Sequence, residues 1–179
     1  LLHSPPTPGH DCACEAAGAD YKRGMSAWSA RFSLSSPEAT VHFAGALAPH
    51  LNPGDILLLD GPIGAGKTHF ARALIHARQT LDNAPLEDVP SPTFTLVQTY
   101  ETPSGEIWHA DLYRLTHPDE VEELGLADAF AEAICLVEWP DRMGDLAPTG
   151  ALRLSFTPGA EPGIRHVAAS SDNPAWATR

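Results

Sequence analysis

The chain has 179 residues, 43% of them hydrophobic, which is enough for one compact α/β domain and too few for two. Its 11 basic and 23 acidic residues give a formal net charge of -12. This balance excludes a protein that holds nucleic acid by itself, because such affinity rests on basic residues that neutralise phosphates. No run approaches the roughly 18 apolar residues of a membrane span, and the start lacks a basic region followed by an apolar one. We therefore expect a cytoplasmic protein.

The two ends of the chain have the composition of unstructured segments. Residues 1–24 are rich in Pro, Gly and small polar residues without a period, and we predict a disordered extension there, upstream of the native start or added for expression. We place the folded P-loop domain at 25–171, beginning near Ala30, and a flexible tail at 172–179. The cysteines do not have the His spacing of a zinc site, so we interpret them as incidental or structural thiols. They are Cys12, Cys14 and Cys135.

The first predicted elements are a strand, a helix and a second strand. RFSLSS, at 31–36, is typical of a short strand, and residues 35–38 predict a helix start with a capping box and a proline in the first turn. The helix continues through VHFAGALAPHL to residue 51 and ends at Asn-Pro-Gly. This turn leads into a predicted strand at 55–60.

Residues 61–68 have the spacing G-x-x-x-x-G-K-T, the pattern of a phosphate-binding loop between a strand and a helix. Its glycines allow backbone conformations in which successive N–H groups point at an anion, and the helix that follows adds its positive N-terminal end. We predict that Lys67 bridges the β- and γ-phosphates of a nucleotide and that the Thr68 hydroxyl ligates Mg²⁺. The predicted nucleotide-binding residues of the loop are Gly61, Gly64, Ala65, Gly66, Lys67 and Thr68.

The rest of the chain alternates strands and helices. An amphipathic helix is predicted to about Arg78, and residues 93–101 and 106–112 flank T-P-S-G as an antiparallel hairpin. DEVEELGLADAFAE predicts two short acidic helices broken at Gly125, and the apolar run ICLVEW predicts a buried central strand. ALRLSFTP and IRHVAAS predict a closing hairpin. The predicted fold is therefore a single P-loop NTPase-like α/β domain with a mixed β-sheet flanked by helices.

Hydrolysis of a bound nucleotide also needs a carboxylate for Mg²⁺ and a group that orients or activates water. Glu138 follows the apolar strand ICLV, and because an unpaired buried charge is costly we predict that it binds the metal. Asp111 ends IWHA in the same way, and we predict a role in hydrolysis or in sensing the γ-phosphate. The alternative for Asp111 is an ion pair with Arg114. Thr93 and Thr95 could each place a hydroxyl near the γ-phosphate, although threonine is also a common strand residue.

Other residues keep two interpretations. His109 either contacts phosphate or water or is hydrogen-bonded to the backbone. Trp139 either packs on the core or forms part of a partner or nucleotide surface. The acidic side chains of the two short helices form either a solvated face or a docking face for a basic partner. They are Glu120, Glu122, Glu123 and Asp128. The turn at 36–38 and the closing hairpin are candidates for adenine contacts.

Five segments closely resemble, in this order and spacing, the TsaE (YjeE) family of bacterial P-loop ATPases: GPIGAGKTHFARAL, SPTFTLVQTYE, WHADLYRL, EELGL and CLVEWPDR. The resemblance covers residues 30–167. That family supports the threonylcarbamoyladenosine modification beside the anticodon of tRNAs that read codons beginning with A. The chain departs from the family pattern at Pro62, where Asp is usual, and at Ala110, where a bulkier aromatic is usual. Neither position contributes a side chain that phosphate binding requires.

The resemblance implies the chemistry and the partners. ATP is expected on the loop, Mg²⁺ on Thr68 and Glu138, and a role in hydrolysis for Asp111; Thr93 and Thr95 match the threonines of the family's S-P-T-[FY]-T-L motif. It also implies an ATPase that is weak alone and acts on a complex of TsaB with the threonylcarbamoyl transferase TsaD. Hydrolysis would reset that complex between rounds, and tRNA would be met only through these partners.

Three other interpretations compete. A small-molecule or nucleoside kinase needs arginines on a lid that clamps the transferred phosphoryl group, but residues 115–134 are acidic and contain no arginine. A GTPase would carry an N-K-x-D guanine-binding motif, which this sequence lacks. A nucleotide-gated scaffold that binds ATP and docks partners without needing hydrolysis remains an alternative.

Overall fold

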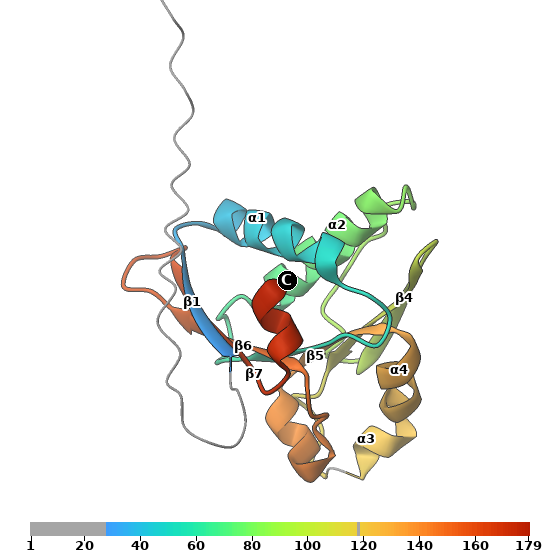
Figure 1. Cartoon of the computed structure of the whole chain (residues 1–179). Coiled ribbons are helices and arrows are strands. Elements are labelled where there is room, and N and C mark those ends of the chain that lie inside the picture. The colour runs from blue at the N-terminus through green and yellow to red at the C-terminus, as the bar shows by residue number, and fades with distance from the viewer. Residues whose placement is uncertain (1–27, 118) are drawn as a thin grey trace, which may run out of the picture.

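A computed structural model describes residues 28–117 and 119–179 of the chain. Within these ranges the protein is a mixed β-sheet covered by helices on both faces (Figure 1). Helices α1 and α2 cover one face, and α3 and α4 cover the other. The predicted fold class is therefore confirmed. The predicted extension at 1–24 lies outside the described residues, as do Cys12 and Cys14.

Seven strands form the sheet in the order β1-β7-β6-β2-β5-β4-β3. Strands β6, β2, β5 and β4 run parallel to one another, whereas β1, β7 and β3 are antiparallel to their neighbours. The carboxyl ends of the four parallel strands therefore meet at one edge, which is where ligands bind in open α/β sheets. The strands are β1 Trp28–Leu34, β2 Ile56–Asp60, β3 Val97–Thr102, β4 Gly105–Asp111, β5 Ile134–Glu138, β6 Leu152–Pro158 and β7 Arg165–Ser171.

The helices follow the predicted order. Ser36 caps α1 by accepting a hydrogen bond from the Ala39 N–H, so a single cap takes the place of the capping box expected at 35–38. Gly125, with φ +72°, separates the two short acidic helices as predicted. The helices are α1 Pro37–Leu47, α2 Lys67–Leu81, α3 Glu120–Glu123 and α4 Leu126–Glu132, with short 3₁₀ segments η1 Ala48–His50, η2 Pro140–Leu146 and η3 Pro174–Thr178. No helix within the described ranges is long and apolar enough to cross a membrane.

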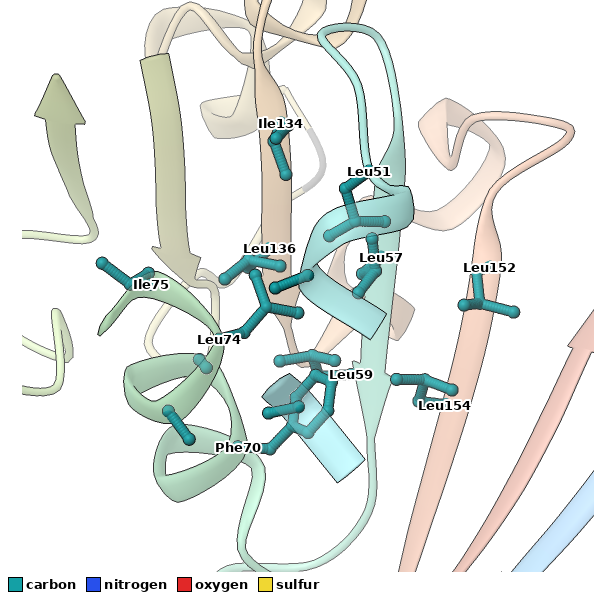
Figure 2. Close-up of a cluster of buried hydrophobic side chains, with 14 of the residues drawn as sticks. Leu51, Leu57, Leu59, Phe70, Leu74, Ile75, Ile134, Leu136, Leu152 and Leu154 are labelled. Atoms are coloured by element: carbon teal, nitrogen blue, oxygen red, sulfur yellow. The ribbon is translucent and has the colours of Figure 1, made fainter. Parts of the chain in front are cut away.

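Alternate residues of the central strand β2 face two separate apolar clusters. Leu57 and Leu59 pack beneath α2, where Phe70 and Leu74 lie in the same cluster (Figure 2). Leu58 belongs to the cluster on the other face, among residues of α3, α4 and η2. A strand buried on both faces explains the continuous apolar run in the sequence. These clusters fix β2 and α2 rigidly on either side of the loop that joins them.

Burial also determines the reactivity of Cys135, the one cysteine in the described residues. Cys135 is fully buried in β5, and this burial raises the pKa of its thiol to about 12. A thiol with so high a pKa carries almost no thiolate at neutral pH, and the thiolate is the reactive form. The interpretation of Cys135 as a structural thiol fits this environment.

Two segments differ from the prediction. Strand β3 begins at Val97 rather than at residue 93, because residues 92–96 form a turn whose Leu96 carbonyl accepts a hydrogen bond from the Asp111 N–H at 2.9 Å. The segment 172–179, predicted as a flexible tail, contains the short helix η3. Trp176 is buried against the core and donates a hydrogen bond from Nε1 to the Gly150 carbonyl at 2.9 Å.

Candidate nucleotide-binding site

The loop at 61–66 connects the carboxyl end of β2 to the first turn of α2. Gly61, Gly64 and Gly66 have φ values of +136°, +76° and +106°, which side-chain-bearing residues rarely adopt. A Cβ at Gly61 would also clash with the carbonyl oxygen of Phe156 in the neighbouring strand β6. Ala65 is buried beneath the loop. The loop is therefore held in the conformation that the glycine spacing predicts.

Lys67 lies in the concavity of this loop. Its side chain is buried, and Nζ donates hydrogen bonds to the carbonyl oxygens of Gly61 at 2.6 Å and Pro62 at 3.0 Å. Nζ also lies 4.0 Å from the ring centroid of Trp139. Desolvation by burial lowers the pKa of Lys67, while the nearby carboxylates of Glu138 and Asp111 oppose this shift. The ammonium group is thus positioned where phosphate oxygens could replace the two carbonyls as acceptors.

Glu138 and Thr68 meet at the centre of the site. The Thr68 Oγ1 donates a hydrogen bond to Oε2 of Glu138 at 3.0 Å, and the glutamate is buried at the end of β5. A hydroxyl and a carboxylate are the hard oxygen ligands that Mg²⁺ prefers, with water and nucleotide phosphates supplying its other ligands. No group of three or more His, Cys, Asp or Glu residues in the described ranges is arranged to hold a metal. One hydroxyl and one carboxylate leave most ligand positions around such an ion to phosphate oxygens and water.

His109 holds the other oxygen of the same carboxylate. Its Nε2 lies 2.9 Å from Oε1 of Glu138, and the ring is fully buried in β4. The remaining ring nitrogen, Nδ1, has no hydrogen-bond partner. The sequence-based interpretations did not include this contact with a carboxylate, and a contact of His109 with phosphate or water stays a prediction. In the register of β4 against β5, His109 is paired with Leu136, two residues before Glu138, so the sequence alone did not reveal this contact.

Asp111 lies beside Glu138, because the two residues are paired in register at the ends of β4 and β5. Its Oδ2 accepts hydrogen bonds from Thr93 Oγ1 at 2.7 Å and Ser91 Oγ at 3.2 Å, and its Oδ1 accepts one from the Tyr113 N–H at 3.1 Å. These donors hold the buried carboxylate in one orientation. The alternative ion pair with Arg114 is not formed; the Arg114 guanidinium lies over the Phe94 ring, 5.1 Å from its centroid.

The two candidate threonines therefore have different environments. Thr93 is half-buried and contacts Asp111, whereas the side chain of Thr95 is exposed and forms none of the hydrogen bonds around that carboxylate. Trp139 is half-buried with a left-handed backbone conformation, φ +60°, and its ring packs against Tyr113 at 4.9 Å between centroids as well as against Lys67. Trp139 thus lines the site while its inner side contacts the core.

Two residues at the site were missed in the sequence. Asp60 accepts a hydrogen bond from the Gly61 N–H at 2.8 Å and lies 3.6 Å from Arg153. Arg165, at the start of β7, donates from Nη2 to the Gly64 carbonyl at 3.2 Å. Asp60 directly precedes the motif and could have been suspected from that position. Arg165 had no local signal, because it reaches the loop only through the pairing of β7 with β6 and of β6 with β2.

A strand, a glycine-rich loop and a helix, with a buried lysine after the loop and a threonine bonded to a strand-end glutamate, are the elements of a P-loop-like fold of the α/β class. The family model of "Threonylcarbamoyl adenosine biosynthesis protein TsaE" matches residues 34–166 of the chain. The chain belongs to this family.

Characterised relatives carry the same description. The chain is 42% identical over 123 residues to the tRNA threonylcarbamoyladenosine biosynthesis protein TsaE of Rickettsia bellii, a match that covers 69% of this chain and 83% of the relative. It is 35% identical over 120 residues to the protein of that name from Bacillus subtilis, covering 66% of this chain and 72% of the relative. The crystal structure of Bacillus subtilis YdiB superposes with a TM-score of 0.70 at 24% identity, covering 85% of this chain and 91% of that one. This last likeness shows the fold.

Proposed function

We infer that the chain acts in tRNA threonylcarbamoyladenosine biosynthesis, a role that its family membership supports. We propose that the chain serves this modification by binding ATP with Mg²⁺ and hydrolysing it, weakly alone and faster on a complex of TsaB with TsaD. The observation that carries the nucleotide part is the 3.0 Å contact between Thr68 and Glu138 beside the buried Lys67. In this arrangement the loop, the Lys67 ammonium group and the two proposed metal ligands lie together at one edge of the sheet.

Each residue has a distinct task in the proposed reaction. The loop N–H groups and the N-terminus of α2 bind phosphate oxygens, and Lys67 exchanges its two carbonyl acceptors for oxygens of the β- and γ-phosphates. Thr68 and Glu138 would hold Mg²⁺, which neutralises the charge that develops on the phosphates. Asp111, fixed by its three donors, orients the attacking water. Thr93 and Ser91 act indirectly, by positioning Asp111.

The negative net charge of the chain supports the proposal that partner proteins, and not this chain, hold the tRNA. With a net charge of -12, the chain is poorly suited to hold tRNA itself, so TsaB and TsaD would carry the substrate. The exposed acidic residues of α3 and α4 are complementary in charge to a basic surface on a partner. We also retain the cytoplasm as the proposed location, because that is where such a modification would take place.

The distinguishing experiment separates hydrolysis from binding. ATP turnover and ATP affinity are measured with Mg²⁺ for three proteins that comprise residues 25–179. They are the unaltered sequence, Asp111→Asn and, as the matched control, Asp128→Asn on the exposed face of α4. We expect Asp111→Asn to lose turnover by about 100-fold, as positioned acid–base groups typically contribute, while its ATP affinity stays within a few-fold. The control should match the unaltered chain in both respects.

The competing functions predict other results. A nucleotide-gated scaffold would support threonylcarbamoyladenosine formation by TsaB and TsaD equally well with Asp111→Asn, because only ATP binding would matter. A small-molecule kinase would transfer phosphate to an acceptor rather than release it. The kinase is disfavoured because the segment that would form a lid consists of short acidic helices without an arginine.

A further inference from the structure

Phe94 is the most exposed large apolar side chain in the described part of the chain, with 86% of its surface open to solvent. Its neighbours in sequence are the two candidate threonines, and its ring is stacked by the guanidinium of Arg114 at 5.1 Å. We call this pair of side chains the Phe94–Arg114 patch. A single exposed apolar residue is ordinary on a protein surface, so the significance of this one depends on what its loop contacts.

The loop that carries Phe94 is tied to the catalytic strand at two points. On one side of Phe94, Thr93 donates to the Asp111 carboxylate at 2.7 Å. On the other side, the Leu96 carbonyl accepts from the Asp111 N–H at 2.9 Å. Leu96 itself has φ +64°, an unfavourable conformation for a residue with a side chain. Phe94 therefore lies between two residues that contact Asp111, one position after Thr93 and two positions before Leu96.

The patch also lies on the same edge of the sheet as the phosphate-binding loop. Asp111 ends β4, and Tyr113 and Arg114 follow it, while the loop at 61–66 follows the parallel strand β2. Ile63 in that loop and Tyr113 are exposed apolar side chains, at 73% and 41%. Three exposed apolar side chains, Ile63, Phe94 and Tyr113, thus lie on loops at the sheet edge that carries the phosphate-binding loop, and exposed apolar residues that gather in one region can mark a docking surface.

We propose that the Phe94–Arg114 patch is the docking point through which a partner protein adjusts Asp111 and accelerates ATP hydrolysis. The occupant is a protein surface with an apolar pocket for the Phe94 ring and a carboxylate at its rim for Arg114. This inference rests on the proposed function, because it needs hydrolysis at Asp111 and a partner that stimulates it. Arg114 suits a carboxylate because a guanidinium forms two parallel hydrogen bonds with that group.

Charge favours a protein over RNA as the occupant. An exposed aromatic ring beside an arginine could also stack on an unpaired base. Tight binding of RNA, however, needs several cations along the phosphate backbone. Within ten residues after Arg114 the chain carries Asp119, Glu120, Glu122 and Glu123 and no further basic residue other than His117. These acids would repel a phosphate backbone that approached the patch.

The test compares basal turnover, affinity for the purified TsaB–TsaD pair, and turnover at a saturating concentration of that pair. The variants are Phe94→Ala and Arg114→Glu. The control is Leu81→Ala, which truncates a side chain that is 49% exposed at the last residue of α2. That position is about 20 Å along the helix from the phosphate-binding loop. Since Phe94 is exposed, its truncation should leave folding and basal turnover within twofold of the unaltered chain.

We expect Phe94→Ala and Arg114→Glu to weaken affinity for the pair at least tenfold and to remove most of the stimulation, with Leu81→Ala unchanged. Stimulation of Phe94→Ala equal to that of the unaltered chain would overturn the docking proposal and leave the proposed function standing. Loss of basal turnover in Phe94→Ala would overturn it too, because the ring would then serve the site directly. If the pair neither bound nor stimulated the unaltered chain, both the docking proposal and the partner part of the proposed function would fail. Binding of tRNA alone that depended on Phe94 would replace the protein partner with RNA.

Discussion

Replacing Gly61 by alanine should destabilise the protein far more than replacing Gly64, although both belong to the same motif. Gly61 has φ +136°, and a Cβ there would clash with the Phe156 carbonyl in β6. Gly64 has φ +76°, and a Cβ there would meet no atom within 4 Å. Both substitutions therefore carry a conformational cost, but only Gly61→Ala adds a steric clash.

The expected magnitudes follow from these environments. At Gly64 the left-handed conformation costs alanine roughly 1 kcal/mol, partly offset because alanine restricts the unfolded chain by about 0.5 kcal/mol. At Gly61 a strained backbone costs about 2 kcal/mol, and displacement of the β6 backbone adds about 2 kcal/mol. We therefore expect Gly61→Ala to lower the free energy of unfolding by about 3 to 4 kcal/mol and Gly64→Ala by less than about 1 kcal/mol.

Urea unfolding of the nucleotide-free protein measures the difference. With an m value of about 2 kcal/mol/M, the midpoint should fall by roughly 1.5 to 2 M for Gly61→Ala and by less than about 0.5 M for Gly64→Ala. The m value should stay the same for both variants if they remain two-state. Equal midpoints for the two variants would refute the claim that the Phe156 carbonyl fixes the loop against β6.

Further predictions address the carboxylate, the lysine and the C-terminal helix. Thr93→Val should lower ATP turnover by about tenfold or more, because a hydrogen bond to a charged group contributes about 1.5 to 3 kcal/mol, whereas Thr95→Val should stay within twofold; equal effects would contradict the assignment of Thr93. Lys67→Met should raise Tm of the nucleotide-free protein at pH 7, because burial lowers the pKa of Lys67 and so disfavours the charged form in the folded state. This gain should shrink as the pH rises through the lowered pKa towards the ordinary value of 10.5, and a Tm difference that did not change up to that pH would contradict the stated cause. Trp176→Ala should lower the free energy of unfolding by about 3 kcal/mol, and a loss below about 1 kcal/mol would show that η3 is dispensable.

The parts of the fold that could be predicted from the sequence depend on local patterns. The glycine spacing at 61–68, the flanking apolar strand and the amphipathic helix all report on residues that are close in the chain, and the structure has them as expected. The position of Glu138 at the end of a buried strand was also predicted from the apolar run before it, whereas its role as a metal ligand stays a prediction. The two hairpins and the break at Gly125 were likewise indicated by turn residues.

The remaining features depend on contacts between distant residues. Thr93 and Thr95 are equivalent by sequence, and only the turn that brings Thr93 to the Asp111 carboxylate separates them. Arg165 lies at the phosphate-binding loop, about 100 residues earlier in the chain, because β7 pairs with β6 and β6 pairs with β2. The polar and small residues after Ser171 suggested a flexible tail, but one aromatic side chain, Trp176, buries itself against the core and orders the segment.

The Mg²⁺ dependence of nucleotide binding tests the assignment of the site most directly. Calorimetric titration of the chain with a non-hydrolysable ATP analogue is performed in excess Mg²⁺ and again in EDTA, for the unaltered chain and for Glu138→Gln. If Thr68 and Glu138 hold the metal, Mg²⁺ should tighten binding by at least about tenfold in the unaltered chain, about 1.4 kcal/mol, and by less than twofold in the variant. An affinity that did not respond to Mg²⁺ in the unaltered chain, or a full response in Glu138→Gln, would contradict that assignment.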